Sequence, residues 1–507
     1  MALSTCFLPH FPRTLLGRAK SSSASRVVGE LQRLRDLALP DLAAMLGTLL
    51  PADFFAKAPD AKAKRERIYP PVTLFWAFLY QVLNPAMPCQ EVVGKVRAWI
   101  ISRGDKQKPS MSTSAYCEAR STVLSVRLLQ AVFDALREHL GRRGASAWLW
   151  CGHRVKVVDG TSFSMPDTDA NQRQWPQPRT QKKGCGFPVA KMLGVFCLST
   201  GAWLGHALSK WRAHDLSLWH RLSHLLERGD VLVGDAGFCA YALMAELHER
   251  GVHSVFRLHQ ARPKDLRQGK SLGRHQSLQT WSKRPHPPER SAWKRRAWAR
   301  LPVQLTVRIV QVPLERRGFR TRCVWIATTL TDPVRYPVEK LAELYFRRWS
   351  IELFYRDIKT TLHMEVMRTK TPAMVEKELL MHAIAYNMIR ALILESAAEH
   401  QQELGRISFK GTVDLLRQWL PHAAACYDQP RKLARWHEEL LEAIASVCNP
   451  LRPGRREPRA KKRRPKSYQL LTSPRHQFQE IPHRERYRAV AYESFPCNPR
   501  VVCVISR

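Results

Sequence analysis

The stretch LAELYFRRWSIELFYRDIKTTLHME, residues 341–365, decides how the second half of this sequence folds. Its leucines and aromatic residues recur at helical intervals, so it predicts one long α-helix. At about 100° per residue, four polar residues of that helix fall within about 60° of one another: Tyr345, Arg348, Glu352 and Lys359. Apolar residues border this face. A glutamate placed there between an arginine and a lysine indicates a face with a function.

The composition predicts a polyanionic partner. The 507 residues include 82 Lys and Arg against 43 Asp and Glu, a formal net charge of +39. Such an excess favours nucleic acid first and an anionic membrane surface second. The membrane is disfavoured because the chain has no uninterrupted apolar run of about 18 residues. Twelve cysteines without a C-x-x-C pair favour reduced thiols. With no signal-peptide pattern at the N-terminus, we expect a soluble, intracellular protein.

Helical and strand-forming patterns follow one another along the chain in blocks. Residues 28–145 are amphipathic and interrupted by prolines, which predicts an all-α N-terminal domain. A polar, basic turn in this domain suits contact with phosphates, and a packing module with a solvated basic face is the alternative. From residue 150 short β-branched runs alternate with helical ones, which indicates an α/β layer. A basic segment at 259–320 interrupts that layer, and a helical pattern follows from 337 to about 447.

Three acidic residues stand out by their positions. Asp159 ends the first strand of the α/β layer, Asp235 ends a later one, and Glu352 lies on the helix. Strand ends of such a layer are where sites assemble. Three converging carboxylates suit Mg²⁺ or Mn²⁺, and two ions about 3.5–4 Å apart can promote phosphoryl transfer. The ordinary alternatives are a turn at each aspartate and a helix ion pair of Glu352 with Arg348 or Arg356.

The spacing Tyr345-x2-Arg348-x3-Glu352-x6-Lys359 matches without a gap the signature of bacterial DDE transposases of the insertion-sequence-four family. The surroundings also resemble that family: VVDGTSFSMPD around the first acid, GDVLVGDAGFCAY around the second and YFRRWSIELFYRDIK around the third. The basic stretch EPRAKKRRPKSYQLLT near the C-terminus is similar as well. The resemblance runs from about residue 40 to residue 488.

The resemblance implies an α/β fold with an RNase H-like catalytic core and an inserted β-rich subdomain. An all-α N-terminal domain would precede the core, and a helical, basic C-terminal region would follow it. The implied segments are a disordered N-terminus (1–27), a helical DNA-binding domain (28–145), the first part of the core (150–258), the inserted basic β-rich subdomain (259–328), the second part of the core with the catalytic helix (329–400), C-terminal helices (401–448) and a basic extended tail (449–507).

The implied activity is cut-and-paste DNA transposition of an insertion sequence. The protein would bind the terminal inverted repeats of the element, cleave the element ends and join them to target DNA. The chemistry would be metal-dependent phosphoryl transfer with two Mg²⁺ or Mn²⁺ ions. The partners would be double-stranded DNA and, on DNA, a second copy of the chain in a homodimer, with no membrane. We expect a cytoplasmic, nucleoid-associated protein.

The resemblance also assigns roles to single residues. Three acids would form the catalytic triad and ligate the metal ions: Asp159, Asp235 and Glu352. Three further residues would hold DNA phosphates beside them: Tyr345, Arg348 and Lys359. In this interpretation the polar face of the helix is filled by metal ions and DNA, with Arg and Lys meeting phosphate oxygens.

Two basic regions each have two interpretations. The insertion tryptophans Trp281, Trp293 and Trp298 are either hydrophobic anchors or platforms for an unpaired base, the role such a tryptophan has in related transposases. We assign DNA binding to Trp298. The Pro-rich segment 452–466 is either a phosphate-contacting tail or a solvated linker. Its four proposed DNA contacts are Lys461, Lys462, Arg463 and Arg464.

Two other functions compete with an active transposase. One is a catalytically decayed copy that still binds its terminal repeats and acts as a repressor. The other is a metal-dependent DNA nuclease that hydrolyses strands without joining them to a target. The presence of all three acids and of the complete helix signature favours the active enzyme.

Overall fold

The polypeptide is described here by a computed structural model. It covers residues 69–85, 87–102, 109–142, 149–289, 291–313, 323–424, 430–450 and 471–478. Among these residues, no helix combines the length and the apolar composition needed to cross a membrane. The predicted N-terminal segment 1–27 and the basic residues 451–470 lie outside the described part of the chain.

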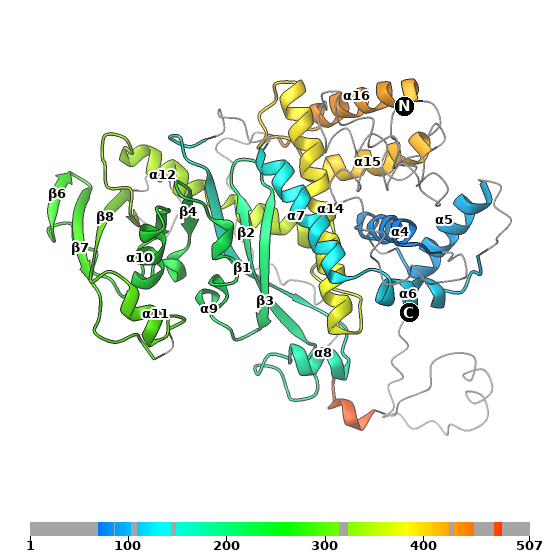
Figure 1. Cartoon of the computed structure of the whole chain (residues 1–507), viewed down its shortest axis with the longest axis horizontal. Helices are drawn as coiled ribbons and strands as arrows, with labels where there is room; N and C mark the ends of the chain where they lie inside the picture. The colour runs from blue at the N-terminus through cyan, green and yellow to red at the C-terminus, as the bar shows by residue number, and fades with distance from the viewer. Residues whose placement is uncertain are drawn as a thin grey trace.

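Four helices come first: α4 (Pro71–Leu83), α5 (Cys89–Ser102), α6 (Ser114–Thr122) and α7 (Val126–Arg142). Helix α4 begins with a proline, whose fixed φ suits the first turn and whose missing N–H is not needed there. Within the described residues up to 142, the regular elements are all helices. Helices α4 to α6 lie on the side of the molecule opposite the outer strands of the sheet (Figure 1).

The centre of the molecule is a mixed β-sheet. Its first five strands are β1 (Val155–Ser164), β2 (Val189–Cys197), β3 (Trp203–Lys210), β4 (Val231–Gly234) and β5 (His253–Arg257). They lie in the order β3-β2-β1-β4-β5. Strand β1 is antiparallel to β2 and parallel to β4, and β4 is parallel to β5. Helix α10 (Tyr241–Glu249) makes the crossover between β4 and β5 and packs on β5.

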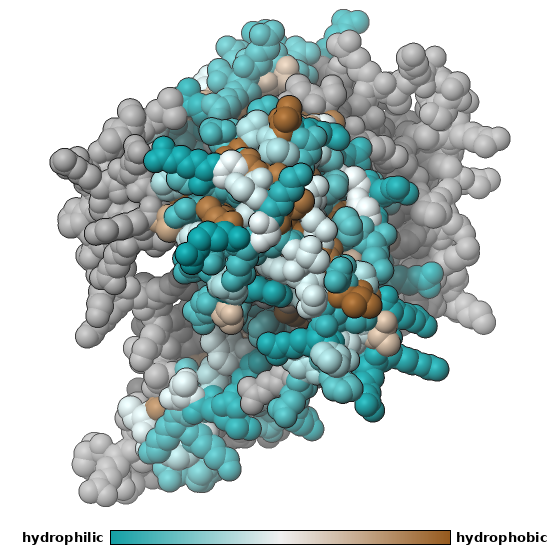
Figure 2. Space-filling view, turned by 90° about the vertical axis from the view of Figure 1, so that its left-hand side faces the viewer, coloured by the Kyte–Doolittle hydropathy of each residue, from teal (hydrophilic) through white to brown (hydrophobic). Residues whose placement is uncertain are grey.

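The basic interruption continues this same sheet. It contributes β6 (Lys270–Gly273), β7 (Gln276–Ser282), β8 (Gln304–Pro313) and β9 (Cys323–Thr328), together with helix α11 (Arg295–Arg300). Strand β9 pairs with β5, so the full sheet has nine strands in the order β3-β2-β1-β4-β5-β9-β8-β7-β6. Figure 2 faces this end of the molecule and shows a largely hydrophilic surface with a few scattered hydrophobic residues.

Helix α14 (Pro372–Glu399) organises the rest of the fold. It is buried on nearly all sides, as expected of a central helix that is apolar all round. Its neighbours are α7, α4 and the C-terminal helices α15 (Phe409–Ala424) and α16 (Pro430–Ser446). Figure 1 shows α14 beside the sheet, with α15 and α16 packed at one end.

The predicted single helix over 341–365 is wrong. The structure divides it into α12 (Val338–Arg347), α13 (Ser350–Arg356) and a π-helical turn, η4 (Asp357–Thr361). Helix α12 packs on β5 and β8, whereas α13 packs on β1, so the chain bends between them. In the π-turn, buried Asp357 pairs with Arg390 of α14 at 3.3 Å. The four signature residues therefore come from consecutive segments, although Arg348 and Trp349 between α12 and α13 keep helical backbone angles.

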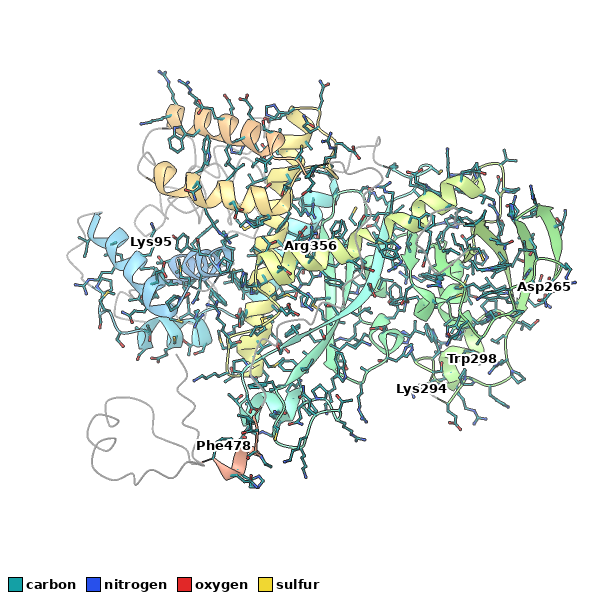
Figure 3. All side chains as sticks on the ribbon, turned by 180° about the vertical axis from the view of Figure 1, so that it is seen from behind. Lys95, Asp265, Lys294, Trp298, Arg356 and Phe478 are labelled. Atoms are coloured by element: carbon teal, nitrogen blue, oxygen red, sulfur yellow. The ribbon has the colours of Figure 1, made fainter. Side chains whose placement is uncertain are left out.

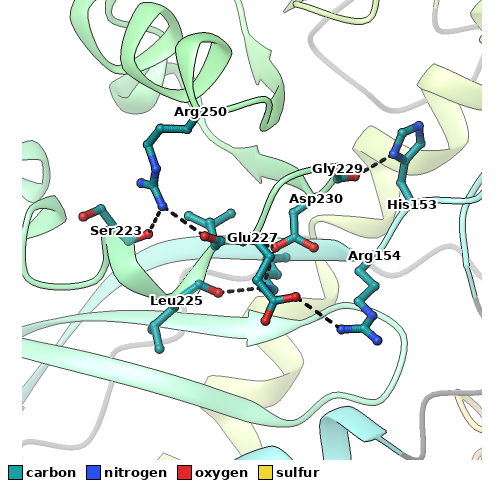
Figure 4. A network of polar contacts seen from close by, with 10 residues as sticks. His153, Arg154, Ser223, Leu225, Glu227, Gly229, Asp230 and Arg250 are labelled. Carbon is teal, nitrogen blue, oxygen red and sulfur yellow. Dashed lines mark hydrogen bonds and ion pairs between the residues drawn. The ribbon is translucent and has the colours of Figure 1, made fainter.

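A polar network fixes the register of β1 against β4 at the end of the sheet away from the signature helix (Figure 4). Lys156 Nζ donates to Asp230 Oδ2 at 2.5 Å and to the Leu225 carbonyl at 2.6 Å. His153 Nδ1 lies 2.6 Å from the Gly229 carbonyl. Lys156 lies in the parallel ladder, opposite Leu232, and its partners Leu225 and Asp230 come before β4, so the network joins the two strands where the ladder begins.

Candidate active site

The first two acids lie level on neighbouring parallel strands. Val157 of β1 pairs with Val233 of β4, and two residues later each chain places an aspartate, Asp159 and Asp235. Neighbouring strands are about 4.8 Å apart, so the two carboxylates share one end of the ladder. The expectation that Asp159 ends its strand is wrong in one respect. The pairing with β4 stops before it, but β1 continues along β2 to Ser164.

Backbone N–H groups orient both aspartates. Asp159 Oδ1 accepts a hydrogen bond from the N–H of Gly160 at 2.8 Å. Asp235 caps a short 3₁₀ turn, η3 (Ala236–Phe238), by accepting from the N–H of Gly237 at 2.8 Å. Tyr355 of α13 donates to the Asp159 carbonyl at 2.6 Å and so ties the signature helix to β1. The two N–H groups each bind the Oδ1 atom of an aspartate, and neither binds the Oδ2 atom.

Arg348 connects the first acid to the third. Its Nη1 lies 3.8 Å from Asp159 Oδ2, and its Nη2 lies 4.0 Å from Glu352 Oε1. The Arg348 side chain is 10% exposed, whereas that of Glu352 is 56% exposed. Tyr345 is buried, and the guanidinium carbon of Arg348 lies 5.8 Å from the centre of its ring. Burial raises the pKa of its phenol, and the charge of Asp235 adds to this rise. The fold therefore gathers the three acids and two signature residues into one neighbourhood.

The environment of Asp159 favours its protonated form. The pKa of this carboxyl is raised to about 6, chiefly by burial and in addition by the charges of Asp235 and Asp215. The N–H of Gly160 and the guanidinium of Arg348 oppose this rise. Desolvation and neighbouring carboxylates are the ordinary causes of a raised acid pKa. A cation bound beside Asp159 would offset both the desolvation and the repulsion from the neighbouring carboxylates.

A fourth carboxylate, that of Asp215, lies in this neighbourhood and was not predicted from the sequence. Asp215 begins the short helix α9 (Asp215–Trp219) and pairs with Lys191 of β2 at 3.0 Å. A Cβ atom on Gly160 would lie 2.6 Å from Asp215 Oδ1, so the glycine beside Asp159 makes room for this carboxylate. The acid comes from a third part of the chain and carries no motif. Only the fold brings it to the site.

Lys359 lies over β1 just beyond Asp159. The π-turn directs its Nζ to the Ser162 carbonyl at 2.9 Å and to Thr161 Oγ1 at 3.4 Å. It also pairs with Glu365 at 3.8 Å. Lys359 and Arg348 thus flank Asp159, one further along the strand and one above it. This arrangement places two cations beside the acids.

The insertion tryptophans are core residues. Trp298 is 5% exposed, packs near Tyr241 and donates its indole N–H to the Arg284 carbonyl at 2.9 Å. Trp293 donates to Glu246 at 2.7 Å, and Trp281 lies under the guanidinium of Arg262. Figure 3 shows Trp298 in the insertion, away from Arg356 on α13. Without DNA, Trp298 thus has the packing expected of a hydrophobic anchor, and its assignment to DNA binding stays a prediction.

Two further predictions concern the basic tail and the metal ligands. The tail residues Lys461, Lys462, Arg463 and Arg464 lie outside the described residues. Within the described ranges, no group of three or more His, Cys, Asp or Glu side chains is close enough to hold a metal ion. Asp159 and Asp235 offer the oxygen-only donors that Mg²⁺ prefers, while Glu352 is turned toward Arg348.

Comparison with known proteins identifies the family. Residues 150–388, which contain all three acids and the signature, match the transposase DDE domain. The chain is 24% identical over 408 residues, 80% of its length, to the transposase InsG for insertion sequence element IS4 from Escherichia coli (strain K12), of which 88% is covered. The chain therefore carries a transposase DDE domain over residues 150–388. As predicted, this domain and the similarity to an insertion-sequence transposase indicate an enzyme that cleaves and transfers DNA strands.

Two solved transposase assemblies show a more distant likeness. A piggyBac transposase synaptic complex with hairpin DNA aligns over 88% of this chain and 86% of that one, at 9% identity and a TM-score of 0.40. A Mos1 transposase paired-end complex with the left transposon end aligns over 38% and 60%, at 15% identity and a TM-score of 0.15. The description of this transposase site therefore rests on its own residues.

Proposed function

We propose that this transposase moves an insertion sequence by a cut-and-paste route. It binds the terminal inverted repeats, cleaves the element ends and joins them to target DNA. One observation carries the proposal: Arg348 lies within 4.0 Å of both Asp159 and Glu352, while the register of the sheet sets Asp235 level with Asp159. Arg348 therefore lies near two of the acids, and the third lies on the strand beside the first.

The catalytic core is RNase H-like in this proposal. The strand order β3-β2-β1-β4-β5, with only β2 against the direction of its neighbours β1 and β3, supports it. The first acid is on the central strand and the second follows the adjacent parallel strand. The core comprises 150–258 and 329–400, interrupted by the basic β-rich insertion at 259–328. The flanking parts are the helical DNA-binding domain at 28–145 and the C-terminal helices at 401–448.

Asp159, Asp235 and Glu352 would hold two Mg²⁺ or Mn²⁺ ions. The ions would activate the attacking oxygen and neutralise charge on the leaving one. The raised pKa of Asp159 supports this assignment, since its neighbours Asp235 and Asp215 disfavour an uncompensated negative charge there. Glu352 would become the third ligand by turning from Arg348 to a metal ion. Its exposed side chain and its separation of 4.0 Å from Arg348 leave it free to do so.

The basic residues of the signature hold and orient the DNA. Arg348 presents a planar fork that can grip a phosphate through two hydrogen bonds. The ring of Tyr345 lies beside Arg348, with its centre 5.8 Å from the guanidinium carbon. Lys359 supplies a point charge on the other side of Asp159, beside the backbone of Ser162. Phosphates flanking the scissile bond would lie between the two cations, with the acids beneath them.

The partners follow from the reaction and from charge. Double-stranded DNA at the terminal repeats and at the target matches the formal net charge of +39. Two element ends must be held together during transposition, so we propose a homodimer on DNA. The tail at 449–507, with Lys461, Lys462, Arg463 and Arg464, would lie along phosphates. The enzyme would act in the cytoplasm at the nucleoid.

The test is a cleavage and joining assay on a duplex that carries the terminal repeat, with Mg²⁺ and a target plasmid. We expect cleavage at the element end followed by strand-transfer products. Binding without cleavage would instead support a repressor. Cleavage at any sequence, without joined products, would support a nuclease.

A further inference from the structure

Two cysteines on neighbouring N-terminal helices meet at one arginine. Cys89 is the first residue of α5, and Cys117 lies on α6. Nη2 of Arg120 donates to Cys89 Sγ at 3.4 Å and to Cys117 Sγ at 3.7 Å. Gln81 of α4 donates to Cys89 Sγ at 3.6 Å. Both thiols are half-buried and free, so three helices converge on a dithiol that the transposition chemistry does not use.

The two sulfur atoms have different roles in this cluster. The pKa of Cys89 is lowered, chiefly by its interaction with the Cys117 thiol, and Arg120 lowers it further. The same interaction raises the pKa of Cys117. The first turn of a helix also favours an anion, and Cys89 occupies it. Cys89 is therefore the thiolate and Cys117 the proton donor.

Arg120 has few other anionic partners. Within the described ranges, no carboxylate forms an ion pair with it, although its charge lowers the pKa of Glu378 against the effect of burial. Its guanidinium packs over the rings of Phe78 and Tyr116 at 5.0 and 4.6 Å and donates to Gln81 Oε1 at 3.0 Å. The thiolate of Cys89 is the acceptor that matches its charge. Neighbouring Tyr69 and Tyr116 both have raised pKa values, largely through burial.

We propose that Cys89 and Cys117 form a reversible disulfide when the transposase meets a hydroperoxide. The Cys89 thiolate attacks one oxygen of hydrogen peroxide, the O–O bond breaks, and a sulfenic acid and hydroxide form. The sulfur of Cys117 then attacks the Cys89 sulfur. The S–S bond forms, and the sulfenic oxygen leaves as water with the Cys117 proton. The two cysteines lose two electrons, and the peroxide is reduced to one hydroxide ion and one molecule of water.

Oxidation would change the environment of the central helix. It removes the anion beside Arg120, and the backbone of this residue contacts α14. Lys377 Nζ of α14 donates to the carbonyls of Arg120 and Ser121 at 3.2 and 2.6 Å. Arg120 therefore contacts Cys89 and Cys117 through its side chain and α14 through its backbone. A change at the two thiols can reach α14, the central helix of the catalytic half, through this one residue.

The first experiment measures alkylation of the reduced full chain by iodoacetamide at pH 6, followed by peptide mass spectrometry. A thiol with an ordinary pKa near 8.5 is only about 0.3% ionised at this pH. A mostly ionised Cys89 gains nearly 300-fold in thiolate and loses roughly 40-fold in intrinsic nucleophilicity. We therefore expect Cys89 to react roughly tenfold faster than Cys448, a half-buried cysteine of the same chain. Equal rates would overturn the assignment of Cys89 as the thiolate.

The second experiment treats the same protein with hydrogen peroxide and searches for a Cys89–Cys117 linked peptide that dithiothreitol releases. Cys117→Ser should abolish the link and leave a sulfenic acid on Cys89 that a 1,3-diketone traps. Cys448→Ser is the matched control and should form the link at the parent rate. A parent protein without the link, or a sulfenic acid that is trapped equally in parent and Cys117→Ser, would refute the proposal.

Discussion

Replacing Arg348 by lysine keeps one positive charge between Asp159 and Glu352 but removes the second of the two donors that face them. A single ammonium group cannot grip a phosphate with the planar fork of a guanidinium. A misplacement of about 1 Å at a reacting centre costs about 100-fold in rate, or about 2.7 kcal/mol of activation free energy. We therefore expect Arg348→Lys to cleave about 100-fold more slowly than the parent.

The same substitution should affect ground-state binding far less, because the charge that meets the phosphate remains. We expect the affinity for a terminal-repeat duplex to fall by no more than about threefold. The assay is single-turnover cleavage of a labelled duplex in Mg²⁺, with affinity measured separately in Ca²⁺. Arg347→Lys is the matched control, since Arg347 is exposed at the adjacent position. It should retain the parent rate.

Stability separates this role from a structural one. The two ion pairs of Arg348 are long, and Glu352 is more than half exposed, so they contribute at most about 1 kcal/mol. Arg348→Ala should therefore lose cleavage while its Tm falls by no more than about 2 °C. Cleavage by Arg348→Lys within threefold of the parent rate would refute the reasoning. A large drop in Tm for Arg348→Ala would show that the arginine mainly holds the fold.

Three further predictions concern the acids and the tail. Asp159→Asn, Asp235→Asn and Glu352→Gln should each abolish nicking while terminal-repeat binding survives, and near-parent cleavage by any one would remove that residue from the triad. The Asp159 carboxyl, with a pKa raised to about 6 from 3.8, is destabilising when ionised, fully so above pH 6 and not at all well below pH 4. In EDTA, Asp159→Asn should thus raise the free energy of unfolding by up to about 3 kcal/mol at pH 7.5 and by about a third of that at pH 4.5. Denaturant titrations at the two pH values measure this gain. A gain that does not depend on pH would contradict the raised pKa of Asp159. Deleting 452–466 removes nine Lys or Arg and one Glu and should flatten the log–log salt dependence of binding by about 0.9 for each phosphate that the shortened protein no longer neutralises; an unchanged slope would mark the segment as a linker.

The positions of the first two acids could be predicted because they depend on local sequence. Each follows a short β-branched run, and parallel neighbours in a sheet end at the same edge. The sequence did not show that β1 continues past Asp159 along β2, because the antiparallel partner lies about thirty residues away. The sequence therefore predicted that Asp159 and Asp235 lie on neighbouring strands, but it did not predict the length of the strand that carries Asp159.

The division of the signature helix could not be predicted from its own residues. Its periodicity fits one helix, and the bend arises because α12 and α13 pack on different strands. The π-turn at Lys359 coincides with the pairing of Asp357 with Arg390, a partner on another helix. Asp215 escaped notice for the same reason, since its nearness to Gly160 is a property of the fold. The burial of Trp298 could not be predicted either, because composition does not distinguish an exposed tryptophan from a buried one.

The ladder between β5 and β9 has a mechanical consequence. Val255, Phe256 and Arg257 of β5 pair with Thr328, Ala327 and Ile326 of β9, and β9 pairs in turn with β8. A load applied to the insertion therefore passes into the strands beside Asp235 through backbone hydrogen bonds and not through a hinge. The insertion should behave as a stiff lever, and the amide hydrogens of β9 should exchange with solvent as slowly as those of β5. DNA gripped at the outer strands would be held at a constant offset from the acids throughout the reaction.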